Sequence, residues 1–150
     1  METRVKGTPD EDDLEKLITT RNAIHHALLS LPPSTASAGP ASETTEGIKY
    51  EMCRIAAIIY STAVLFGLPA DSGWHLPLLD RLTLCVESLP EDPHENLVIW
   101  ALCIGALTSS ELSARGGFED RLRGAIADRQ LASWSDVEAI LEGFLWSASA

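Results

Sequence analysis

The longest apolar run, residues 55–68, constrains the fold most: it is 14 residues long and carries no charged side chain. A second uncharged segment covers residues 97–107. As helices, both would be apolar nearly all round, which is typical of helices at the centre of a bundle. The run of 14 is too short to cross a bilayer, for which about 20 residues are needed. The sequence therefore predicts a bundle built around two buried helices.

The remaining apolar residues recur at helical spacing on one side only, and no segment alternates as a strand would. We expect an all-α fold, a single bundle of about six helices. The first helix begins at a capping box, Thr8 to Glu11, and ends at Pro32. The others are expected at 48–66, 76–89, 96–113, 118–129 and 135–146. The fourth starts after a second cap at residues 92–95, the fifth follows a stop at Gly116-Gly117, and the sixth starts from a capping box at Ser135.

Residues 34–46 contain no large apolar residue and are rich in Ser, Thr and Ala. Such a segment is typical of a flexible linker. The expected organisation is thus an N-terminal helix over residues 1–33, the linker over 34–46, and a helical core over 47–150. The linker makes the first helix a detachable element.

The chain is acidic, with a net charge of −11 and no basic run. Phosphate backbones and anionic membranes repel such a surface, so we expect no direct contact with nucleic acid and no membrane partner. The three cysteines, at 53, 85 and 103, form no metal-binding spacing, and no metal or cofactor is expected. Their odd number, without a signal peptide, indicates a reducing compartment, so we expect an intracellular protein, nuclear or cytoplasmic.

Glu51 and Arg54 lie three residues apart at the start of an apolar helix, so they share one face. One interpretation is an ion pair that fixes the helix against its neighbour. The other is a ligand clamp, in which Arg54 holds a carboxylate that Glu51 orients. The sequence leaves both open.

Other candidate residues depend on whether a pocket exists between the helices. Trp74 and His75 fall in the turn before the third helix, where loops at bundle ends often line pockets. Tyr60, Asp80 and Trp100 complete the candidate ligand-binding set, although a packing role is the plainer interpretation, above all for Trp100. No catalytic triad, phosphate loop or paired carboxylates occur, so no catalytic residue is assigned.

Several separated blocks of this sequence resemble the C-terminal regulatory domain of fungal-specific transcription factors. The Tyr-Glu-x-Cys-Arg signature opens the block 50–61, and residues 66–69 resemble the exit that follows it. Three further blocks keep the family's order: 97–107, where Ala106 replaces a Gly, 115–118, where Gly117 replaces a Trp, and Ser133-Trp134 with residues 144–146. Together they span residues 50–146.

The resemblance implies an all-α regulatory domain that makes dimer contacts and lies C-terminal to a binuclear zinc cluster. That cluster needs six cysteines in a basic segment, and residues 1–49 contain none. We therefore expect a stand-alone regulatory or interaction module that does not bind DNA itself. Its expected partners are a second copy of the chain, as a homo-oligomer, or a full-length related regulator.

The alternative is a small helical binder, or a cyclase or isomerase, that acts on a hydrophobic fungal secondary metabolite. Helix bundles commonly hold ligands between facing helices, and the candidate residues above would reach such a cavity. A deep closed cavity would favour this alternative, whereas an exposed apolar helix face would favour the interaction module.

Overall fold

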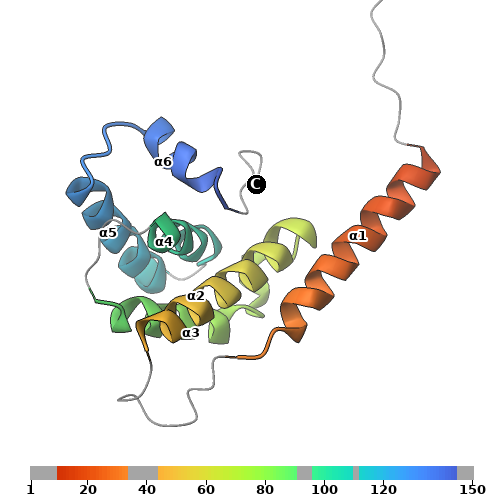
Figure 1. Cartoon of the computed structure of the whole chain (residues 1–150), viewed down its shortest axis with the longest axis horizontal. Helices are drawn as coiled ribbons and strands as arrows, with labels where there is room; N and C mark the ends of the chain where they lie inside the picture. Colours follow the sequence, from red (N-terminus) through yellow and green to blue (C-terminus); the bar gives the residue numbers. More distant parts are fainter. Residues whose placement is uncertain (1–9, 34–43, 91–95, 110–111, 145–150) are drawn as a thin grey trace, which may run out of the picture.

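Two helices, α2 (Thr45–Tyr60) and α4 (Asn96–Thr108), lie at the centre of the structure (Figure 1). The computed structural model describes residues 10–33, 44–90, 96–109 and 112–144. Both central helices are buried along most of their length, as their apolar sequences predicted. Met52, Ile55 and Ile59 of α2 share one core with Ile99 and the other buried residues of α4.

The helix α2 continues into a π-helical turn, η1 (Ser61–Leu65), so the segment expected as one helix over 48–66 changes its hydrogen bonding near its end. The N–H of Phe66 donates to the carbonyl of Ser61, which is the wider π spacing. Gly67, at φ 61°, then turns the chain. A short 3₁₀ turn, η2 (Ala70–Ser72), leads to α3.

The other helices of the bundle pack around this centre. Helix α3 (Leu76–Ser88) packs against α2 and α4, while α5 (Leu112–Asp128) and α6 (Trp134–Leu141) pack against α4. Figure 1 shows α5 on the side of α4 that faces away from α1, and α6 above α4. The described residues contain six α-helices and no strand, so the expected all-α bundle is confirmed.

The expected helix stop at Gly116-Gly117 was wrong, because α5 runs through both glycines. A glycine in a helix interior costs only about 1 kcal/mol relative to alanine. The extensive contact of α5 with α4 outweighs that cost. Local propensity was overridden here by tertiary packing.

The start of α6 also differs from the expectation. The capping box is formed by Ser133 and Asp136, not by Ser135, so the helix begins at Trp134 and ends at Leu141 rather than at residue 146. The Asp136 carboxylate accepts the backbone N–H groups of Ala132 and Ser133, each at 2.9 Å, and the Ser133 hydroxyl at 3.1 Å. The sequence contains two overlapping patterns of a serine followed three residues later by an acid, Ser133 with Asp136 and Ser135 with Glu138. The extended backbone of Ser133 makes the earlier serine the N-cap.

Helix α1 (Glu11–Ser30) stands apart from this core and has no buried residue. It begins after Asp10, whereas Thr8, the expected cap, lies outside the described residues. Its contacts are with α2 and η1 (Figure 1). The expected linker falls mostly on residues 34–43, which are not described, and α2 already begins at Thr45. The expected cap at 92–95 also lies outside the described residues.

Candidate functional site

Glu51 of α2 is a buried carboxylate that binds two arginines. Arg54, one turn further along α2, donates from Nε to Oε2 at 2.9 Å and from Nη2 to Oε1 at 2.8 Å. The Glu51 side chain is only 5% exposed, and that of Arg54 is 10% exposed. This hydrogen bond raises the pKa of the Arg54 guanidinium, because the carboxylate stabilises its charged form.

The second arginine, Arg81, comes from α3 and was not predicted. Its Nη2 lies 2.6 Å from Oε1 of Glu51, so one carboxylate joins α2 to α3 across 30 residues of sequence. The candidate residue expected from the sequence was the neighbouring Asp80, which is exposed. Nothing local distinguishes the two positions, since the direction of each side chain depends on how α3 lies on α2.

The three side chains carry one more positive charge than negative charge. A shallow hollow of about 160 Å³ opens beside them, lined by Glu51, Arg81, Leu84, Cys85 and Ser88. Arg54 does not line this hollow among the described residues, whereas the half-exposed Arg81 does. The arrangement fits the ion-pair interpretation, in which the cluster fixes the position of α3 on α2.

The other candidate residues do not join this cluster. Tyr60 and Trp100 are buried in the core, and Trp100 stacks on Phe144 with ring centroids 5.5 Å apart. Burial raises the pKa of the Tyr60 hydroxyl. The structure thus brings Glu51 and Arg54 together and places the remaining candidates elsewhere.

His75, which directly precedes α3, is fully buried. Its ring meets Trp74 edge to face, with centroids 4.9 Å apart. Within the described part of the chain, neither ring nitrogen of His75 nor the indole N–H of Trp74 has a hydrogen-bond partner. Unpaired buried polar groups are uncommon and costly. No contact links this pair to Glu51 or Arg54 in the hydrogen bonds and ion pairs of the described residues.

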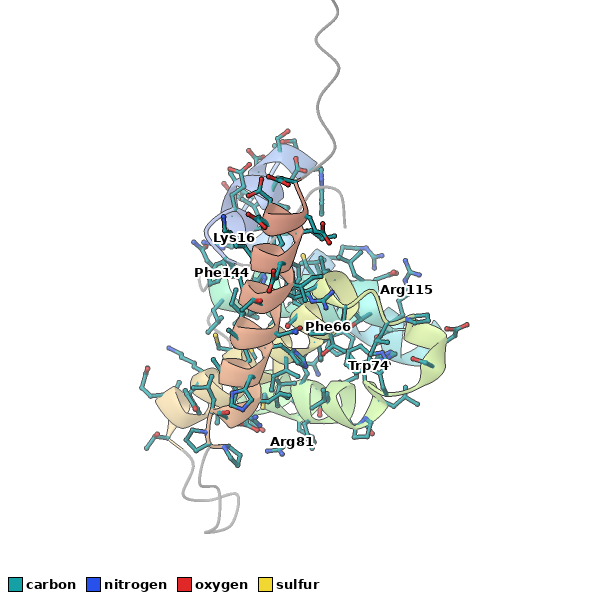
Figure 2. All side chains as sticks on the ribbon, turned by 90° about the vertical axis from the view of Figure 1, so that its right-hand side faces the viewer. Lys16, Phe66, Trp74, Arg81, Arg115 and Phe144 are labelled. Atoms are coloured by element: carbon teal, nitrogen blue, oxygen red, sulfur yellow. The ribbon has the colours of Figure 1, made fainter. Side chains whose placement is uncertain are left out.

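The C-terminal half of α1 docks on the turn η1 through a few specific contacts. His25 Nδ1 lies 2.8 Å from the Ser61 hydroxyl, and its ring lies 4.6 Å from that of Phe66. The guanidinium of Arg21 lies 4.4 Å above the same Phe66 ring, a cation–π contact. Figure 2 labels Phe66 near α1. The Tyr50 hydroxyl donates to the carbonyl of Pro32 at 2.8 Å, just after α1 ends.

With the rest of the described chain, the N-terminal half of α1 makes no comparable contacts. Leu14, Leu17 and Ile18 are 51%, 63% and 43% exposed, and Figure 1 shows this half of the helix clear of α2. These residues continue the face that Arg21, His25 and Leu28 turn toward the bundle, because they precede them at helical spacing. We call Leu14, Leu17 and Ile18 the free face of α1.

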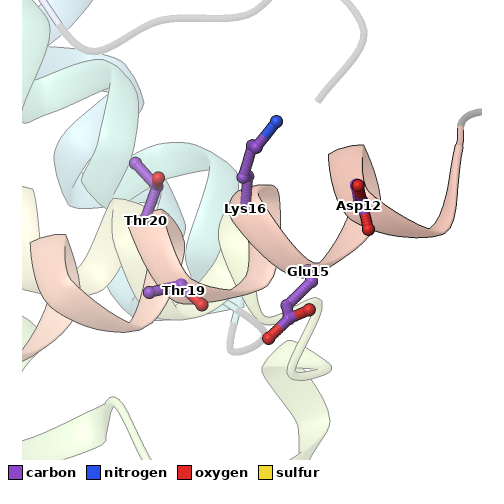
Figure 3. Close-up of a pocket in the computed structure, with 5 residues that line it drawn as sticks. All are labelled: Asp12, Glu15, Lys16, Thr19 and Thr20. Atoms are coloured by element: carbon purple, nitrogen blue, oxygen red, sulfur yellow. The ribbon is translucent and has the colours of Figure 1, made fainter.

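Two further hollows are open to solvent. A groove of about 510 Å³ lies between α3, α4 and α5. Its lining residues are Val86, Glu87, Leu89, Pro90, Val98, Leu102, Arg121, Gly124, Ala125 and Asp128, and none of them is a candidate from the sequence. The other hollow, of about 290 Å³, is lined, among the described residues, by five polar residues of α1 between Asp12 and Thr20 (Figure 3).

Within the residues that the structure describes, no three His, Cys, Asp or Glu side chains gather closely enough to hold a metal ion. Among the described helices, none has the length and apolar character that a membrane span requires. No disulfide joins two of the described cysteines, and burial raises the pKa of the Cys103 thiol to about 11.

These features define a helical domain without a recognisable catalytic centre in its described part. The family profile of the fungal specific transcription factor domain matches residues 2–147, nearly the whole chain. The chain belongs to this family. The match includes α1 and therefore extends beyond the blocks at 50–146 that carried the resemblance. No curated protein and no solved structure matches the chain.

Proposed function

We propose that this chain is a regulatory module of the fungal transcription factor family that acts through protein–protein contact and does not itself bind DNA. Membership of the family supports the regulatory role. The net charge of −11 argues against direct contact with a phosphate backbone. The module works inside the cell, in the nucleus or the cytoplasm.

The observation that carries the proposal is the free face of α1. Leu14, Leu17 and Ile18 are exposed to water, where apolar side chains contribute nothing to the stability of the fold. A contiguous exposed apolar face of this kind marks a contact surface. The same helix is firmly docked one to two turns later, so its position is defined by the fold. A partner would bury the free face without disturbing those contacts.

The alternative, a binder or cyclase for a hydrophobic metabolite, rests on the groove between α3, α4 and α5. Its volume of about 510 Å³ suits a small ligand. However, the groove is open, the candidate ligand residues lie elsewhere, and two of the titratable residues that line it, Glu87 and Arg121, form an ion pair with each other at 3.0 Å. A small hydrophobic compound that copurifies with the chain and is identified by mass spectrometry would favour this alternative.

The experiment that tests the proposal is a reporter assay in a fungal cell. The whole chain is fused to an unrelated DNA-binding module, and transcription from the matching promoter is measured. We expect the fusion to change transcription and Leu17→Glu to remove the change. The matched control is Thr19→Glu, which adds the same charge on the polar side of the same helix. A fusion without effect, or one equally active with Leu17→Glu, would refute the proposal.

A further inference from the structure

We propose that α1 is a releasable helix, which opens away from the bundle while the rest of the bundle stays folded. Four residues hold it in place: Arg21 and His25 of α1, with Ser61 and Phe66 at the two ends of η1. We call these four residues the latch. The docked state predominates, and release is a local opening. The inference goes beyond the proposed function and does not depend on a partner.

Burial sets α1 apart from the two central helices. It is 20 residues long and has no buried residue, whereas α2 and α4 are buried along most of their length. Within the described residues, Leu28 alone joins α1 to the apolar core, and it is only partly buried. Segments with few buried apolar contacts open at a lower free energy than the whole domain. We therefore expect α1 to open separately from the core.

The latch is centred on one aromatic ring. The guanidinium of Arg21 lies 4.4 Å from the centroid of the Phe66 ring, and the centroid of the His25 ring lies 4.6 Å from it. Arg21 and His25 are four residues apart, so they are neighbours on the same face of α1. His25 Nδ1 also lies 2.8 Å from the Ser61 hydroxyl. Two side chains of α1 therefore depend on a single ring beside η1.

Phe66 contributes to the docking of α1 and not to the core of the bundle. Its side chain is half-buried and, among the described residues, is not part of the apolar core. The helices of the bundle pack on one another without it, since α2 contacts α3 and α4, and α4 contacts α5 and α6. Loss of the contacts at Phe66 should therefore release α1 and leave the bundle intact.

Docking has a cost at the latch itself. Nε of Arg21 is buried and has no hydrogen-bond acceptor among the described residues, and Nη2 makes only a long 3.5 Å contact with Asn22. A buried donor without an acceptor has lost the hydrogen bonds that water gives it. Release returns Nε to water, which offsets part of the lost cation–π contact. This offset brings the released state closer in free energy to the docked state.

Release changes the surface that the molecule presents. Opening of α1 uncovers the side of η1 that carries Phe66 and the Ser61 hydroxyl, which α1 contacts in the docked state. It also separates the Tyr50 hydroxyl from the carbonyl of Pro32, which are 2.8 Å apart when α1 is docked. The free face of α1 loses the fixed position that the bundle gives it. The latch thereby controls both the surface of η1 and the placement of the free face.

Hydrogen–deuterium exchange of backbone amides, measured by mass spectrometry on the full chain, tests the latch. A helix detached from its bundle is marginal in water, so the amides of α1 exchange once it is released. We expect α1 to exchange about 100-fold faster than α2 and α4, and still about tenfold slower than an unstructured peptide. Exchange of α1 as slow as that of α2 and α4 would overturn the inference, because α1 would then open only with the whole bundle. Exchange at the rate of an unstructured peptide would overturn it too, because no latch would hold the helix.

Two substitutions test the latch from its two sides. Phe66→Ala should raise the exchange rate of α1 about tenfold and leave those of α2 and α4 unchanged, because the ring serves the docking of α1. Its matched control is Leu68→Ala, which truncates an exposed apolar side chain two residues further on. Arg21→Ala leaves η1 untouched, so it keeps the test sharp if Phe66→Ala disturbs the turn. It should raise the rate about threefold, since it removes the cation–π contact together with the buried Nε.

The control for Arg21→Ala is Lys16→Ala, which removes an exposed basic side chain of the same helix. Both control variants should exchange like the parent chain. An exchange rate of α1 that responds to neither Phe66→Ala nor Arg21→Ala would refute the latch. A rise in the rates of α2 and α4 that matches the rise in α1 would refute the separate opening of α1.

Discussion

Phe118 of α5 lies against Gly105 of α4 so closely that a Cβ built on Gly105 would be 2.6 Å from two of its ring carbons. Both residues are buried, and the surrounding core leaves the ring little room to move. The contact explains why α5 and α4 approach each other as closely as they do. It also explains why this position of the apolar helix carries no side chain.

Gly105→Ala should therefore destabilise the fold, even though alanine is the better helix former. We expect the free energy of unfolding to fall by about 1–3 kcal/mol, because the aromatic ring must shift within a packed core. Chemical denaturation followed by circular dichroism measures this. An unchanged midpoint would mean that Phe118 has more freedom than the packing indicates.

The matched substitution in α5 should have the opposite sign. Gly117 is exposed and lies inside the helix, and a Cβ added to it would meet no atom within 4 Å. Gly117→Ala should raise the free energy of unfolding by about 0.5–1 kcal/mol through helix propensity alone. Loss of stability would instead indicate that α5 is broken at the glycines, as the local sequence suggests.

Glu51→Gln should be strongly destabilising, since it leaves the guanidinium of Arg54 buried beside a neutral amide. Removing one partner of a buried ion pair typically costs about 3–5 kcal/mol. The control is Arg81→Met, which leaves the Glu51–Arg54 pair balanced and removes a half-exposed side chain. It should cost about 1 kcal/mol or less, as an exposed ion pair does. Equal effects of the two substitutions would contradict this ranking.

His75→Leu should leave the stability unchanged or raise it. The imidazole is fully buried and has no hydrogen-bond partner among the described residues, so its desolvation is uncompensated. An apolar side chain of similar volume removes that cost, which is about 1–3 kcal/mol for a polar group. Thermal unfolding of the variant against the parent chain is the measurement. A marked loss of stability would show that His75 has a polar partner in the folded protein.

Asp136 should make the stability of α6 depend on pH in the acid range. Hydrogen bonds from the backbone of Ser133, then from its hydroxyl, then from the backbone of Ala132 lower the pKa of this carboxyl below its ordinary value of 3.8. A lowered folded-state pKa stabilises the fold above the unfolded value, and the contribution is lost as pH falls through the folded pKa. The loss should therefore occur below pH 3.8.

The variant Asp136→Asn tests this contribution. It should lower the stability near neutral pH and show a smaller loss of stability below pH 3.8 than the parent chain. Urea denaturation at a series of pH values makes the comparison. Parallel curves for the two proteins would show that the capping carboxylate does not contribute.

The candidate site could be predicted only in part from the sequence. The pair Glu51 and Arg54 follows from helical periodicity, because residues three apart share a face. Arg81 does not, since its approach to Glu51 depends on how α3 crosses α2. Similarly, the burial of His75 without a partner is set by the packing around the turn before α3, where no periodic pattern operates.

The sequence by itself determined that the chain is all-α and that residues 48–60 and 97–107 form the buried centre, because an apolar surface on all sides of a helix has to be covered. It also indicated the positions of α1 and α3, whose ends carry strong helix signals. Only the tertiary structure decided that α5 continues through Gly116 and Gly117, because the gain from packing on α4 exceeds a local cost. It likewise decided that Leu28 of the α1 stripe is partly buried against the core, whereas Leu14, Leu17 and Ile24 stay exposed. An apolar stripe in the sequence indicates that one face of a helix has to be covered. Only the arrangement of the helices determines how much of that face the chain itself covers.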